Sequence, residues 1–213
     1  MDKIKRTNSK LGIILGIGGY SIFVFLDSII KKFLVDYYSI IQITFYISLF
    51  SFIPVIIVLS YLKSWNVLIN NKIHIQLFRG ALGLMCGLII VNLFQNHSLT
   101  EIYPILFSTP LILTIFSHFF LKEKIGLQRI VAVLFGFIGV LIVSRPGTIH
   151  FTWSLFGLFI AAIILATNVI IIRKLANTQS SLAFAFYGTV SGLILSFIFG
   201  NQYFITLRED DFL

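Results

Sequence analysis

Asp27 is the residue whose type and position most directly suggest chemistry in this chain. It is the only carboxylate inside a predicted apolar span, and an acid within a membrane is costly, which favours a functional role. Lys31 lies four residues further on, so an i,i+4 ion pair is the alternative, structural role. Because the spans hold only one acid, we do not expect a proton relay made of several carboxylates.

A second group of candidate residues surrounds Pro110, which we expect in the middle of a helix. Proline removes a backbone hydrogen bond there and frees a carbonyl group. Interrupted helices of this kind often line transporter sites, and a plain packing kink is the alternative. Ser108 and Thr109 come directly before the proline and carry hydroxyl groups that can bind a polar substrate.

Amide, aromatic and basic side chains complete the set of candidates for a substrate pathway. We expect Asn92 to face a cavity, whereas an interhelical hydrogen bond is the alternative role for Asn168. Tyr46 and Tyr187 each follow a phenylalanine; aromatic faces attract cations, and ordinary helix packing is the alternative. Arg79 opens an apolar run, where it either contacts an anionic substrate group or reaches the lipid headgroups.

The sequence contains no enzyme or metal-binding signature. Its four histidines lack metal-ligand spacing, and it has no nucleophile elbow, phosphate loop or paired carboxylates. The net charge is +8, but the basic residues lie between apolar runs and do not form a stripe with exposed aromatics, which argues against nucleic acid. We therefore expect no catalytic residue, no metal, no cofactor and no nucleic acid; the expected partners are the lipid bilayer and a small-molecule substrate.

Apolar runs must position these residues. Hydrophobic residues make up 58% of the chain and charged residues only 11%, against about 25% charged in soluble domains. The runs approach the length of about 20 helical residues that crosses a bilayer. The sequence thus predicts an all-α integral membrane protein with about seven transmembrane helices, at residues 11–30, 39–62, 77–95, 102–121, 128–144, 153–172 and 182–199.

The basic residues between these runs predict the orientation of the chain. With the N-terminus in the cytoplasm, twelve of the 16 Lys and Arg residues fall on the inner side and four on the outer side. Cytoplasmic loops carry an excess of Lys and Arg. We therefore expect the N-terminus to be cytoplasmic.

An internal repeat predicts the domain organisation. Sliding the chain by 141 residues aligns polar and aromatic positions: Asp27 with Asn168, Ser39 with Ser180, and Phe45-Tyr46 with Phe186-Tyr187. The first copy holds five spans, an odd number, so the second copy enters the membrane the opposite way round, as in many transporters. We expect a cytoplasmic tail at 1–10, a complete five-helix repeat at 11–147 and a truncated inverted second repeat, with two helices and a tail, at 148–213.

The second copy is expected to supply only two of its five helices, because residue 213 corresponds to residue 72 of the first copy. Two explanations stay open. Either the chain is shortened relative to its architecture, or a protein partner completes it. That partner is another membrane chain or, in a homo-oligomer, a second copy.

Short motifs between residues 79 and 146 carry a resemblance to a known family. In chain order they are Arg79-Gly80, Pro104, Pro110-Leu111, Phe120-Leu121-x-Glu123, Gln128-Arg129, Gly136-x-x-Gly139-Val140 and Arg145-Pro146. This pattern resembles the EamA family of the drug/metabolite transporter superfamily. Within that family the chain is most similar to S-adenosylmethionine uptake carriers of intracellular bacteria, through Asp27 followed by Lys31 and Lys32.

The resemblance implies ten helices in two inverted halves, with a central cavity lined by the first four helices of each half. It implies alternating-access transport of a small polar metabolite across a bacterial inner membrane, with S-adenosylmethionine first among the substrates and an amino acid or related metabolite next. Because the second half is short here, the alternative is a non-transporting relic, or a subunit that needs a partner chain.

Overall fold

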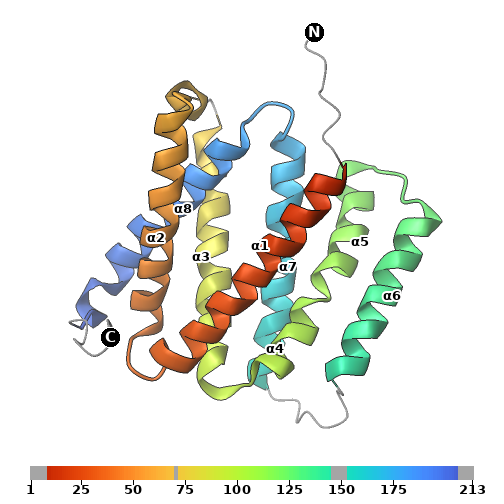
Figure 1. Cartoon of the computed structure of the whole chain (residues 1–213), viewed down its shortest axis with the longest axis horizontal. Helices are drawn as coiled ribbons and strands as arrows, with labels where there is room; N and C mark the ends of the chain where they lie inside the picture. Colours follow the sequence, from red (N-terminus) through yellow and green to blue (C-terminus); the bar gives the residue numbers. More distant parts are fainter. Residues whose placement is uncertain (1–8, 70–71, 145–152, 206–213) are drawn as a thin grey trace.

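The computed structural model describes residues 9–69, 72–144 and 153–205, and within these ranges the regular structure is helical (Figure 1). The main helices are α1 (Ser9–Ile29), α2 (Ile40–Tyr61), α3 (Ile73–Asn96), α4 (Leu99–Leu106), α5 (Thr109–Leu121), α6 (Leu127–Ser144), α7 (Trp153–Leu175) and α8 (Ser181–Gly200). A π-helical turn, η1 (Ile30–Leu34), extends α1, and two 3₁₀ turns are η2 (Trp65–Leu68) and η4 (Asn201–Tyr203). The all-α prediction is confirmed.

Six stretches of the described chain are long and apolar enough to cross a membrane. They are Ile14–Leu34, Ile40–Tyr61, Ile73–Asn96, Leu99–Leu121, Phe156–Leu175 and Ser181–Tyr203. The predicted fifth span corresponds to the helix α6, which is 18 residues long and contains the apolar stretch Ile130–Ile142. The predicted tail up to residue 8, the motif Arg145-Pro146 and the last eight residues lie outside the described ranges.

Serine side chains mark the starts of three helices. Ser39 accepts a hydrogen bond from the backbone N–H of Gln42 at the start of α2, and Ser180 accepts one from Leu182 at the start of α8. Such caps satisfy N–H groups that lack a partner within the helix. The third is Ser98, which precedes α4 and donates its hydroxyl to the carboxylate of Glu101 at 2.8 Å, not to a backbone group.

The helices pack in two groups that share α3 (Figure 1). Helix α8 packs on α2 and α3, whereas α7 packs on α3, α4 and α5. Glycines allow the close approach of α8: a Cβ on Gly80 would overlap the side chain of Ser191, and one on Gly200 would lie 2.7 Å from Ile41. Small residues therefore bring α8 close to α3 at Gly80 and close to α2 at Gly200.

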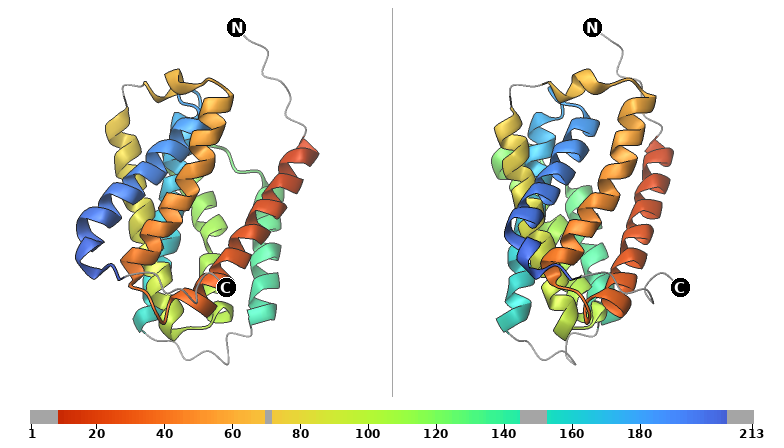
Figure 2. Two further views of the ribbon diagram at one scale, coloured as in Figure 1. Left: turned by 60° about the vertical axis from the view of Figure 1, so that its left-hand side comes forward. Right: turned by 90° about the vertical axis from the view of Figure 1, so that its left-hand side faces the viewer.

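Helix α1 lies along one side of the bundle, with α8 on the other side (Figure 2). The large apolar side chains of Leu11 and of the segment from Ile14 to Leu26 are exposed to the surroundings, and burial begins at Asp27 and Ile30. Ile30 belongs to a hydrophobic cluster with Val91 and Phe94 of α3. The protein therefore holds α1 by its C-terminal end. In Figure 1, α1 and α7 run in opposite directions, and so do α2 and α8.

Alanine at position 80 tests the packing of α3 on α8. We expect Gly80→Ala to lower the free energy of unfolding by about 1–3 kcal/mol, because overpacking forces neighbouring groups to shift. Gly83→Ala is the matched control, since nothing lies within 4 Å of a Cβ there. Alanine at that exposed position should stabilise the helix by up to about 1 kcal/mol. Unfolding in detergent measures both; equal stability of the two variants would contradict this packing.

Candidate functional site

Asp27 lies at the C-terminal end of α1, directly before the π-helical turn, and its side chain is only 7% exposed. The hydroxyl of Tyr103, from α4, donates a hydrogen bond of 2.8 Å to Asp27 Oδ2. This bond joins the first and fourth predicted spans. Sequence reasoning missed Tyr103, although a buried acid signals that a donor must lie near it.

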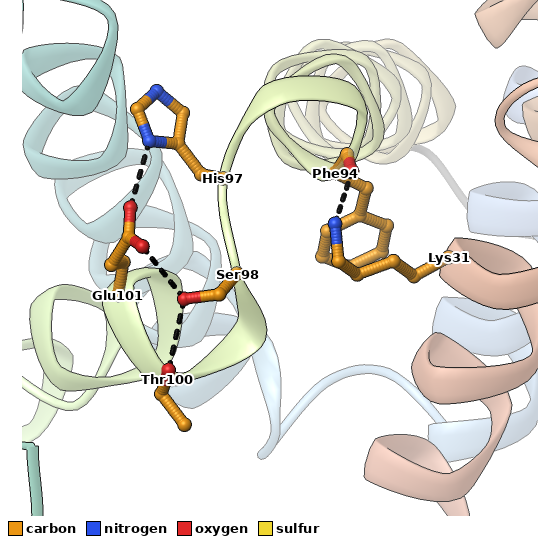
Figure 3. Close-up of polar contacts among 6 residues, drawn as sticks. All are labelled: Lys31, Phe94, His97, Ser98, Thr100 and Glu101. Carbon is orange, nitrogen blue, oxygen red and sulfur yellow. Dashed lines mark hydrogen bonds and ion pairs between the residues drawn. The ribbon is translucent and has the colours of Figure 1, made fainter.

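Lys31 does not pair with Asp27, so the predicted alternative role of the acid is wrong. Its ammonium group donates instead to the backbone carbonyl of Phe94, at 2.5 Å (Figure 3). Phe94 lies in the last turn of α3, where carbonyl groups lack partners within the helix and a positive charge is stabilising. Gln95 adds a second link, because its side-chain amide donates to the carbonyl of Val35 at 3.3 Å.

A cluster of polar side chains occupies the connection between α3 and α4 (Figure 3). His97 Nδ1 lies 3.0 Å from Glu101 Oε2, and Ser98 Oγ lies 2.8 Å from Glu101 Oε1 and 2.9 Å from the Thr100 hydroxyl. Each carboxylate oxygen of Glu101 therefore has its own partner. The cluster fixes the start of α4, and with it the position of Tyr103 one turn later.

The fourth predicted span is broken at Pro110. Helix α4 ends at Leu106 and α5 begins at Thr109, so Pro110 lies in the first turn of α5, where a missing N–H costs little. Ser108 Oγ donates to the carbonyl of Ile105 at 2.6 Å. The hydroxyl of Thr109 is buried and has no hydrogen-bond partner among the described residues. The span Leu99–Leu121 is therefore interrupted at Phe107 and Ser108, and the hydroxyl of Thr109 next to the interruption has no partner among the described residues.

A cavity of about 510 Å³ lies between α1, α4 and α6. Its walls include Val24, Tyr103, Pro104, Phe107, Gly136 and Gly139. The rings of Tyr103 and Phe107 lie 5.8 Å apart on one wall. Val24 is three residues before Asp27, on the same face of α1. The cavity is therefore apolar and partly aromatic. Asp27 is not one of its lining residues; the hydroxyl of Tyr103 connects the Asp27 carboxylate to the wall.

The other predicted pathway residues do not contact this acid. Asn92 is exposed on α3. Asn168 is buried, and its amide donates to the carbonyl of Ile164 in its own helix at 3.3 Å, so the expected interhelical bond is not formed. Tyr46 lies against Phe45 and Phe50 of its own helix, with ring centres 5.6 and 6.4 Å away.

Arg79 and Tyr187 lie together near the opposite end of α3. The guanidinium group of Arg79 donates to the carbonyl of Phe184 and lies over its ring, 5.6 Å from the centre. The Tyr187 hydroxyl donates to the carbonyl of Leu68 at 2.6 Å. Fifteen residues separate Arg79 from Phe94, which is about 22 Å of helix. In this structure both side chains fasten α8 to neighbouring segments, so they form a region distinct from the Asp27 site.

Replacing Lys31 tests how the end of α1 is held. Lys31→Met keeps the length of the side chain but removes the ammonium group from the carbonyl of Phe94. We expect a loss of about 1–2 kcal/mol of unfolding free energy. Lys32→Met is the control, because Lys32 is exposed and lies 5.0 Å over the neighbouring ring of Phe33. An effect of Lys32→Met as large as that of Lys31→Met would show that general charge loss, not this bond, matters.

Comparison with known proteins places the chain in a family. Residues 10–145 match the EamA-like transporter family. The S-adenosylmethionine uptake transporter of Rickettsia felis is 34% identical over 100 residues, which cover 47% of this chain and 34% of that protein. Solute carrier family 35 member G1 of Homo sapiens is 27% identical over 171 residues, covering 74% of this chain and 47% of that protein.

The riboflavin transporter of Vibrio cholerae is 29% identical over 136 residues, which cover 60% of this chain and 44% of that protein. The matches thus span about a third to a half of the length of these relatives. No solved structure matches the chain significantly. Because the family match covers most of the chain and the helices include six membrane-spanning stretches, this multi-pass membrane protein belongs to the EamA-like transporter family, which is a family of transporters and not of enzymes.

Proposed function

We propose that the chain carries a small polar metabolite across a bacterial inner membrane, with S-adenosylmethionine as its first candidate substrate. The observation that carries this proposal is the family match over residues 10–145. The similarity to a rickettsial S-adenosylmethionine uptake transporter favours that substrate. An amino acid or a related metabolite is the alternative.

Alternating access between two inverted halves is the proposed mechanism. The halves are residues 11–147 and 148–213, preceded by a cytoplasmic tail at 1–10. Two observations support an inverted relation: the helices capped by Ser39 and Ser180 start 141 residues apart, and α1 and α7 run in opposite directions (Figure 1). The seam of α8 with α2 and α3 is the contact that such a motion would have to open and close.

The substrate pathway proposed here passes the end of α1 and the break in the fourth span. Asp27 supplies the charge. The hydroxyl of Thr109, which has no partner among the described residues, supplies a hydrogen-bonding group at the interruption between α4 and α5. We propose that Ser108, Asn168 and Tyr187 support the helices, because each donates a hydrogen bond to a backbone carbonyl. Arg79 has the same kind of role through Phe184.

Uptake by purified protein in lipid vesicles tests the transport proposal. We expect saturable uptake of labelled S-adenosylmethionine that an excess of the unlabelled compound suppresses. Riboflavin and a mixture of amino acids serve as competitors, so that the same assay compares the alternative substrates. Vesicles without protein are the control.

Absence of uptake of all these compounds, with the protein shown to be inserted, would contradict the proposal. That result would favour the alternative of a subunit that does not transport by itself. Inhibition by riboflavin or amino acids, with no effect of S-adenosylmethionine, would overturn the choice of substrate but keep the transport function.

A further inference from the structure

We infer that Asp27 binds a positively charged group of the substrate, and that Tyr103 is the residue that positions its carboxylate. This inference rests on the proposed function and specifies the chemical class of the substrate as an organic cation. Three observations support it: only one oxygen of the Asp27 carboxylate has a hydrogen-bond partner, a cavity lies next to Tyr103, and Lys31 is bonded to a backbone carbonyl instead of to Asp27.

Only one oxygen of the Asp27 carboxylate is satisfied. Tyr103 bonds Oδ2, and Oδ1 has no hydrogen-bond partner among the described residues. A buried carboxylate in a membrane needs a counter-charge or further donors. The acid is therefore half-satisfied and can accept one more strong donor at Oδ1.

The protein does not supply that counter-charge from nearby within the described chain. Lys31 is the basic residue at the i,i+4 position, and the carbonyl of Phe94 occupies its ammonium group. The ion pairs of His97 with Glu101 and of Arg173 with Glu123 do not include Asp27. A metal ion is disfavoured too, because no cluster of three or more His, Cys, Asp or Glu side chains occurs among the described residues. The described part of the chain therefore leaves Oδ1 open to a cation from outside the protein, and we assign this place to a cationic group of the substrate.

The cavity beside the acid has the size and lining for such a ligand. At about 510 Å³ it falls within the range of roughly 300–1,000 Å³ that is usual for small-molecule sites. No charged side chain lines it in the described part of the chain, and one wall carries the rings of Tyr103 and Phe107. Aromatic faces attract cations, so a ligand with a cationic centre and a flat or apolar body fits both parts of the site.

Tyr103 links the two parts of the site. Its ring lines the cavity and its hydroxyl holds Asp27 Oδ2. With that oxygen held, the orientation of the carboxylate is set, and Oδ1 is the oxygen left for the ligand. Tyr103 is therefore a positioning residue, whereas Asp27 makes the direct contact.

A pair of ligands that differ in charge tests the inference. S-adenosylmethionine carries a sulfonium centre, whereas S-adenosylhomocysteine has a neutral thioether at the same place and lacks one methyl group. Equilibrium binding of both to the purified full chain in lipid nanodiscs gives a ratio of affinities. We expect the wild type to prefer the sulfonium compound.

Asp27→Asn should reduce this ratio by about tenfold or more, because a charge-assisted contact is lost. Asp27→Glu keeps the charge and should restore part of the ratio. Tyr103→Phe keeps the ring but frees the carboxylate, so we expect a decrease of about threefold in the ratio, less than for the loss of a charged contact. Tyr61→Phe is the control, since Tyr61 is exposed at the end of α2, far along the chain from the cavity lining.

The outcomes separate this inference from the proposed function. Wild-type protein that binds neither compound contradicts the choice of substrate, and this inference falls with it. Wild-type binding with unchanged affinities for both compounds in Asp27→Asn overturns the inference alone. An equal loss for both compounds would support it and assign Asp27 to the ammonium group that the two ligands share, not to the sulfonium centre. A higher ratio in Tyr103→Phe would overturn the positioning role, because it would mean that the hydroxyl competes with the ligand. Tyr103→Phe also decides the matter if Asp27→Asn does not fold, as judged by its melting temperature.

Discussion

A carboxylate within the membrane must find its partners in the protein, because the hydrocarbon offers none. In this chain the hydroxyl of Tyr103 meets that requirement for one oxygen of Asp27. The bond ties the end of α1 to α4, and α1 has few other contacts with the bundle. The same bond connects the carboxylate to a residue that lines a cavity. Structure and proposed chemistry therefore depend on one pair of side chains.

Helix α3 is central to the packing of the bundle, because α2, α7, α8 and the turn η1 all contact it. At its C-terminal end, the ammonium group of Lys31 and the hydrophobic cluster around Phe94 hold α1. Near its other end, Arg79 reaches a carbonyl of α8, and Gly80 lets α8 approach. In both places a long basic side chain from one element satisfies a backbone carbonyl of another. Such bonds are valuable where water is excluded.

Local pattern was enough to predict much of this fold. The apolar runs gave helices at the expected places, and α4 starts at Leu99, directly after Ser98 of the Ser98-x-x-Glu101 sequence. Pro110 was expected to interrupt a helix, and the structure has a short interruption just before it, between α4 and α5. These features depend on residues that are neighbours in the sequence, so one chain suffices to find them.

The predicted pairing of Asp27 with Lys31 failed for a specific reason. The i,i+4 rule assumes a regular α-helix, but residues Ile30–Leu34 form a π-helical turn with its wider i→i+5 bonding. Lys31 is thereby free to reach Phe94. Tyr103 and Arg79 could not be assigned their partners, because Asp27 and Phe184 lie 76 and 105 residues away and only the packed helices bring them together.

A double-mutant cycle on unfolding tests the central claim, that Tyr103 and Asp27 are bonded and together hold α1. The variants are Asp27→Ala, Tyr103→Phe and the double substitution, unfolded in the same detergent mixture. The structure predicts that the two effects are not additive, with a coupling free energy of about 0.5–3 kcal/mol. Additive effects, with a coupling near zero, would contradict the bond and the account built on it.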